Sequence, residues 1–209
     1  MVDPKSLKYS NITISGLPGA GSSTLGRGLE KRLGWKYFGG GDFMREHAVK
    51  KGLFNKGVPL HHSATVYRDE FDKKVDYGMR RRLQKESGQI LDAWLSGFMA
   101  LKLKRVLRVV VYCQNDDLRV DRLVNRDGVS VEEAKRHIFK REEENLSKWS
   151  RLYKKEWEEW VPEKLQAVRR GEWLDFYNQE LYDLAIDTYS HDRQASLRLV
   201  LDKLGVRAV

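Results

Sequence analysis

A glycine-rich stretch, "GLPGAGSST" at residues 16–24, constrains the fold of this chain more than any other feature. It follows the β-branched run "NITISG" (11–16), which predicts a buried strand. It leads into residues 22–34, where leucines recur at helical spacing before Gly34 and predict a helix. A glycine loop between a strand and a helix is the setting that a phosphate-binding loop requires.

The loop fits the pattern G-x-x-x-x-G-K-[ST] at every fixed position except Ser22, where the pattern has lysine. Its glycines let successive backbone N–H groups point at one anion, and the following helix adds its positive N-terminal end. Ser23 is placed to offer its hydroxyl to Mg²⁺, whereas Ser22 donates a hydrogen bond but brings no charge. A glycine-rich turn with only packing duties is the alternative for this motif alone. The candidate phosphate-binding residues are Gly16, Gly19, Ala20, Gly21, Ser22, Ser23 and Thr24.

Predicted strands alternate with predicted helices along the rest of the chain. The further strands are expected at 36–38, 89–92, 108–113 and 184–187, and the further helices at about 42–51, 64–86, 116–127, 130–153 and 191–204. Ser130 with Glu133 forms a capping box that opens one of these helices. Alternation of this kind predicts a three-layer α/β fold with a mostly parallel sheet, and 209 residues suffice for one domain.

Composition narrows the class of protein. The chain is 41% hydrophobic and 33% charged, as in globular domains, and no apolar run reaches the roughly 20 residues that span a membrane. The N-terminus lacks the apolar core of a signal peptide, and a single cysteine, Cys113, suits a reducing compartment. We therefore expect a cytoplasmic monomer. The net charge of +9 fits nucleic acid or phosphate-rich small molecules and does not separate the two.

Two further segments have candidate functional residues directly after predicted strands. Asp92 ends the strand "QILD", where a carboxylate can hold Mg²⁺ directly or through water, and a helix-capping role is the alternative. Asp42 is expected to cap the next helix, and Arg45 within that helix could clamp a phosphate with two hydrogen bonds. A solvated surface arginine is the alternative for Arg45.

A cationic block follows the fourth predicted strand. Arg119, Arg122 and Arg126 recur at i, i+3 and i+7 and share one helical face. Arg141 and Lys148 share a face of the next helix. Such charge is often only a solvated surface, but two cationic helices after a strand could also close over bound phosphates and supply the charge that Ser22 lacks.

At these residues the chain resembles the nucleoside monophosphate kinases, most closely the archaeal-type cytidylate kinases. The similar blocks are "ITISGLPGAGSSTLGRGLEKRLGWKYFGGGDFMRE", "DRLVNRDGVSVEEAKRHIFKREEENLSKWSRLY" and "YDLAIDT". The resemblance implies a P-loop NTPase fold with a five-stranded parallel sheet. It also implies a core at about 8–38, 87–118 and 180–209, a region binding the nucleoside monophosphate (NMP) at 39–86, a helical lid at 119–153 and an extra helical insertion at 154–176.

The resemblance also implies an activity, the Mg²⁺-dependent transfer of the γ-phosphoryl group of ATP to CMP or dCMP. The 16–24 loop would bind ATP, and Ser23 and Asp92 would bind the metal. The implied catalytic residues are Asp92, Arg122, Arg126, Arg141 and Lys148. The implied substrate-binding residues are Asp42, Arg45, Asp72, Asp76 and Trp94, with Asp72 and Asp76 on the nucleobase side.

This sequence departs from the family pattern at three places. A hydroxyl residue at position 22 is what we expect of the archaeal-type group. The family's "EGR" after the third strand is "DAW" here, so Trp94 replaces an arginine expected to bind the acceptor phosphate. Residues 154–176 carry three tryptophans and are expected to form a helical hairpin packed on the domain, with a partner-binding surface as the alternative.

Three functions stay open on the sequence. The first is the NMP kinase. The second is a nucleotide-binding sensor or partner-binding protein of the same fold, and the third and least favoured is a basic nucleic-acid-binding protein.

Overall fold

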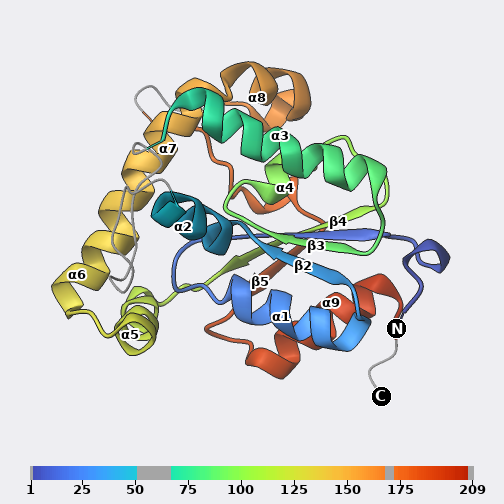
Figure 1. The fold of residues 1–209 in the computed structure, drawn as a ribbon, viewed down its shortest axis with the longest axis horizontal. Helices are drawn as coiled ribbons and strands as arrows, with labels where there is room; N and C mark the ends of the chain where they lie inside the picture. Colours follow the sequence, from blue (N-terminus) through green and yellow to red (C-terminus); the bar gives the residue numbers. More distant parts are fainter. Residues whose placement is uncertain (1, 51–66, 168–171, 207–209) are drawn as a thin grey trace.

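The computed structural model describes residues 2–50, 67–167 and 172–206. Five parallel strands form one sheet in the order β2-β3-β1-β4-β5 (Figure 1). Their bounds are Asn11–Gly16 (β1), Lys36–Gly39 (β2), Gln89–Asp92 (β3), Val106–Tyr112 (β4) and Leu184–Asp187 (β5). The predicted five-stranded parallel sheet is confirmed, and because all strands run the same way their carboxyl ends meet at one edge.

Helices cover both faces of the sheet and its carboxyl edge. In Figure 1, α1 and α9 lie below the sheet, α3, α4 and α8 lie above it, and α2, α5, α6 and α7 gather at its left end. The bounds are Ser22–Leu33 (α1), Gly40–Lys50 (α2), Asp69–Lys85 (α3), Ser96–Met99 (α4), Asp116–Asp127 (α5), Val131–Lys135 (α6), Arg141–Leu152 (α7), Lys154–Trp160 (α8) and Arg193–Leu204 (α9). Single 3₁₀ turns lie at Pro4–Ser6, Glu163–Leu165 and Gln179–Leu181, and a π-helical segment at Arg136–Lys140 joins α6 to α7. The three-layer α/β/α architecture is as predicted.

The central strand β1 is buried along its whole length, which explains its run of β-branched residues. Ile12 and Ile14 are fully buried in a cluster with Leu29 and Leu33 of α1. A second cluster on the opposite face joins β4 to α4, α7 and α8 and includes Phe98 and Trp157. The core thus lies on both faces of the sheet, and the carboxyl edge of the sheet is available for a functional site.

Helix ends largely follow their predicted signals. Gly34 and Gly128 have left-handed backbone conformations at the ends of α1 and α5, as glycine does at many helix ends. The Ser130 side chain accepts a hydrogen bond from the Glu133 N–H at 3.1 Å, as the capping box predicts. The prediction for Asp42 is wrong: α2 already begins at Gly40, so Asp42 lies in its first turn and pairs with an arginine of α1 instead of capping.

The segment 154–176 differs from the expected helical hairpin. Its described residues form α8 and one 3₁₀ turn and then continue without a second helix. Trp157 and Trp160 pack against Phe98, which confirms the packing role, whereas the Trp173 side chain is 42% exposed. The short helix α4 and the π-helical segment were not predicted.

The expected helix at 64–86 begins at Asp69 in the structure, and the sequence "GLFNKGVPLHHS" before it falls outside the described residues. Among the helices that the structure describes, none is long and apolar enough to cross a membrane.

Candidate active site

The glycine loop joins β1 to α1 at the carboxyl edge, as the sequence predicts. Gly19 and Gly21 have φ values of +78° and +97°, which favour glycine. A Cβ on Gly19 would lie 2.7 Å from the carbonyl oxygen of Arg119, so a side chain there would collide with backbone. Helix α1 starts directly after Gly21, which has no side chain to cap the first-turn N–H groups. The loop is therefore shaped to bring backbone N–H groups to an anion.

Asp92 lies buried next to this loop at the end of β3. Its Oδ2 atom accepts hydrogen bonds from Ser23 Oγ at 2.7 Å and from Tyr37 Oη at 2.8 Å. Burial raises the pKa of the Asp92 carboxyl, and hydrogen bonds from Ser23, Tyr37 and Ser22 offset part of that rise. The Ser23 hydroxyl and the Asp92 carboxylate thus place two oxygen atoms close together, and oxygen is the ligand type that Mg²⁺ prefers.

Tyr37 was missed by the sequence analysis. It lies in β2 next to β3, and its pKa is raised mainly by burial and also by the nearby Asp92 carboxylate. The signal was available, because parallel strands bring their carboxyl ends together.

Two arginines of α5 hold the loop by its carbonyl groups. Arg122 donates to the Gly19 carbonyl at 3.0 Å and to the side chain and backbone of Thr188, just after β5. Arg119 donates to the Pro18 carbonyl at 3.1 Å. Both share one helical face, as predicted, and they fix the shape of the loop from that face.

A pocket of about 720 Å³ opens over the loop. Of the residues predicted for the site, those lining it are Gly16, Gly19, Gly21, Ser22, Ser23, Thr24, Asp42, Asp92, Trp94, Arg122, Arg126 and Arg141. Ala20, also in the loop, is fully buried, and its carbonyl accepts a hydrogen bond from the Thr188 hydroxyl at 2.8 Å. The loop after β5 adds Thr188 and His191, and the start of α9 adds Arg193. The sequence analysis missed these residues although they follow a predicted strand end.

Arg141 and Trp94 meet on the wall of this pocket. The guanidinium carbon of Arg141 lies 5.0 Å from the centre of the Trp94 ring, in cation–π geometry. The Trp94 and Trp149 rings pack edge to face, with their centres 5.3 Å apart and their planes at 70°. Arg126 also lines the pocket and forms an ion pair with Asp127 at 2.8 Å.

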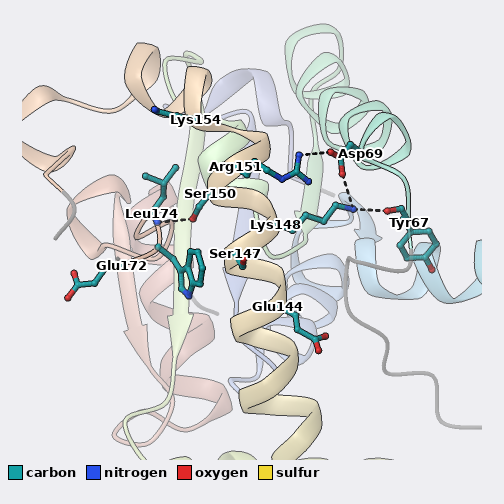
Figure 2. A pocket seen from close by; sticks show the side chains of 11 residues that line it. Tyr67, Asp69, Glu144, Ser147, Lys148, Ser150, Arg151, Lys154, Glu172 and Leu174 are labelled. Atoms are coloured by element: carbon teal, nitrogen blue, oxygen red, sulfur yellow. Dashed lines mark hydrogen bonds and ion pairs between the residues drawn. The ribbon is translucent and has the colours of Figure 1, made fainter. Parts of the chain in front are cut away.

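Three predicted residues lie together between α3 and α7, apart from the pocket over the loop. Lys148 donates to Asp72 Oδ2 at 2.6 Å and to the Tyr67 carbonyl at 2.7 Å, and the Tyr153 hydroxyl donates to Asp76. Figure 2 shows Lys148 and the neighbouring Arg151 reaching Asp69 from α7, beside a second pocket of about 760 Å³. The structure therefore brings Asp72, Asp76 and Lys148 to one another and does not bring them to the glycine loop.

Arg45 belongs to α2, but its side chain lies outside the described residues, and its role stays a prediction.

A sequence model of the cytidylate kinase-like family matches residues 11–190. The chain belongs to this family. The predicted enzyme class, a nucleoside monophosphate kinase, is thereby confirmed.

Curated relatives match along most of their length. The cytidylate kinase of Methanopyrus kandleri is 29% identical over 204 residues, which cover 92% of this chain and 93% of the relative. The cytidylate kinase of Pyrococcus abyssi is 31% identical over 185 residues, which cover 85% and 83%.

Solved structures share the fold at low identity. An uncharacterized protein from Eubacterium ventriosum superposes with a TM-score of 0.60 and 12% identity, covering 94% of this chain and 98% of its own. A gluconokinase from Sinorhizobium meliloti superposes with a TM-score of 0.53 and 13% identity, covering 95% and 93%. The likeness to the gluconokinase agrees with the predicted P-loop fold.

Proposed function

We propose that this protein transfers the γ-phosphoryl group of ATP to CMP or dCMP, giving CDP or dCDP, with Mg²⁺ as cofactor. The observation that carries the proposal is one pocket in which the glycine loop, the Ser23–Asp92 oxygen pair and the side chains of Arg126 and Arg141 meet. The choice of a cytidine nucleotide as the acceptor is supported by the names of the curated relatives.

The donor side is assigned to the loop. Backbone N–H groups of residues 16–24 would bind the ATP phosphates, and Arg122 would keep the loop in shape through its bond to the Gly19 carbonyl. Ser23 and Asp92 fit Mg²⁺ because both offer oxygen, and Mg²⁺ held by these residues would supply positive charge to the phosphates. The buried position of Asp92 shields its charge from water and strengthens its interactions inside the site.

Arginines would bind the transferred phosphoryl group in place of the lysine that the loop pattern has at position 22. Arg126 and Arg141 come from α5 and α7, within residues 119–153, which we assign as the lid. Residues 39–86 are assigned as the acceptor-binding region, with Asp42 and Arg45 on the phosphate side. Catalysis by positioning and electrostatic stabilisation needs no covalent intermediate.

Asp72, Asp76 and Lys148 keep their proposed places on the acceptor side. Because Lys148 is already paired with Asp72, we assign these residues to the surface between the acceptor region and the lid, and expect them to contribute through that contact.

A coupled assay with ATP, Mg²⁺ and a panel of NMP and dNMP acceptors tests the proposal. We expect CMP and dCMP to have the highest kcat/KM, and Ser23→Ala to raise the Mg²⁺ concentration needed for half-maximal rate because one oxygen ligand is lost. Turnover of a purine NMP in preference to both cytidine nucleotides would refute the acceptor. No turnover of any acceptor by folded protein that binds ATP would refute the phosphoryl transfer.

A further inference from the structure

Trp94 follows the end of β3, two positions after Asp92, and lines the pocket. Its ring contacts α7 twice, through Arg141 at 5.0 Å and Trp149 at 5.3 Å. The two α7 residues are eight positions apart, about two helical turns, so they present one face to the same ring. Trp94 therefore connects the Asp92 end of the sheet with one face of the lid helix.

The backbone before Arg141 determines which face of α7 is turned towards Trp94. The five residues Arg136–Lys140 are π-helical, and the Arg141 N–H donates to the carbonyl of Arg136, five positions back. A π turn contains one residue more than an α turn, so it rotates the side chains that follow by about 100° relative to an uninterrupted α-helix. Arg141 is the first residue after this turn, and its orientation towards Trp94 depends on it.

Trp94 and Arg141 both line the pocket over the glycine loop. The face of an aromatic ring attracts and orients a guanidinium without neutralising its charge. Trp94 is therefore placed to orient the Arg141 side chain at the wall of this pocket.

We propose that Trp94 is a positioning residue that holds the Arg141 guanidinium, by its ring face, against the phosphoryl group transferred in the pocket. The inference rests on the phosphoryl transfer proposed above and adds to it a residue that the family pattern would assign to arginine. Trp94 does not bind the phosphoryl group itself but acts through Arg141.

The test compares Trp94→Leu, which removes the ring face, with Trp94→Phe, which keeps a smaller one. We expect Leu to lower kcat about tenfold, with a smaller change in the KM for ATP, and Phe to recover most of the loss. Because Trp94 acts through Arg141, Trp94→Leu should change kcat by less than about twofold in an Arg141→Ala background.

A matched control lies outside the pocket. Trp160 also supports an arginine, with the guanidinium carbon of Arg80 at 4.1 Å from its ring. Trp160→Leu should lower Tm and leave kcat within about twofold of wild type. If it lowers kcat as much as Trp94→Leu does, the effect reports general loss of packing and the proposal fails.

Two other outcomes overturn the inference while wild-type turnover stands. One is a Trp94→Leu kcat within about twofold of wild type, and the other is an equal fold loss from Trp94→Leu with and without Arg141. If wild type binds ATP without turnover, the proposed function fails, and the same double-mutant cycle is then measured by calorimetry as Kd for ATP. Non-additive losses of affinity support the Trp94–Arg141 coupling, and additive losses refute it.

Discussion

At the scale of single residues, Asp92 shows how this site is organised without a loop lysine. Its buried carboxylate accepts from hydroxyl groups of Ser23 and Tyr37 on two different elements. These neutral donors orient the carboxylate and favour its ionised form, which offsets part of the effect of burial. Ser22 also lowers the pKa of this carboxyl as a neutral donor.

Arg141 carries the first prediction. If its charge stabilises the phosphoryl group during transfer, Arg141→Ala should lower kcat by about 100-fold and raise the KM for ATP far less. Arg151→Ala is the matched control, because Arg151 lies on the same helix but pairs with Asp69 and lines the second pocket. Steady-state kinetics measure both. Equal factors on kcat and KM for Arg141→Ala would contradict the role.

Asp76 carries a prediction about pH. Burial raises its pKa from 3.8 to about 7, although the Tyr153 hydroxyl donates to it. Between these values the folded protein binds a proton that the unfolded chain releases, so this group's stabilising contribution is full below about pH 4 and is lost as the pH rises to about 7. Asp76→Asn removes this titration. We expect the free energy of unfolding of the variant, relative to wild type, to rise from about pH 5 to about pH 7.5 in urea titrations. A difference that is constant with pH would contradict the shifted pKa.

At the scale of elements, the sequence predicted what local chemistry determines. All five strands were located, most clearly β1 and β4 because of their β-branched runs, and α5 was predicted with its observed ends, Asp116 and Asp127. The π-helical segment and α4 carry no local signal that separates them from ordinary helix or loop. Their conformation depends on packing against other elements.

In the site, too, residues with a local sequence signal were predicted, and contacts that depend on packing were not. The glycine loop, Asp92 and the arginines were predictable because a strand end or a helical spacing identifies each of them. The pairing of Lys148 with Asp72 was not, because residues 76 positions apart in sequence meet only through the packing of α7 on α3. Trp94 was noted as a departure from the family pattern, but its contact with Arg141 also needs the tertiary structure.

The α3–α7 contact leads to a prediction at this scale. The Lys148 side chain is 6% exposed and that of Asp72 is 5% exposed, so replacing Lys148 with Met leaves a buried carboxylate without its cation. We expect the free energy of unfolding to fall by about 3–5 kcal/mol. Replacing Asp72 with Leu in the same chain should recover most of it, because a buried apolar pair substitutes well for a buried ion pair. Urea unfolding of the two variants measures this. A double variant as unstable as the single one would show that the loss comes from shape and not from the unpaired charge.

At the scale of the whole molecule, the described residues of the segment 154–176 contribute aromatic side chains to the core. Its aromatic residues complete the cluster on the α4 face of the sheet, where Phe98 contacts Trp157 and Phe176 at ring distances of 6.1 and 4.9 Å. The same cluster includes Trp149 and Tyr153 from α7 and its end. The described residues of the segment therefore support α7 from the side that faces the sheet.

A pair of tryptophans separates this structural role from a surface role. Trp157 is 2% exposed, so Trp157→Ala should lower the free energy of unfolding by about 3–5 kcal/mol through the cavity it leaves. Trp173 is 42% exposed, so Trp173→Ala should change it by no more than about 0.5 kcal/mol. Because the cluster joins the segment to β4 and α7, the Trp157 variant should still unfold in one cooperative transition, with far-ultraviolet and near-ultraviolet circular dichroism coinciding. Two separate transitions would show instead that the segment folds independently of the sheet, and would place the support for α7 elsewhere.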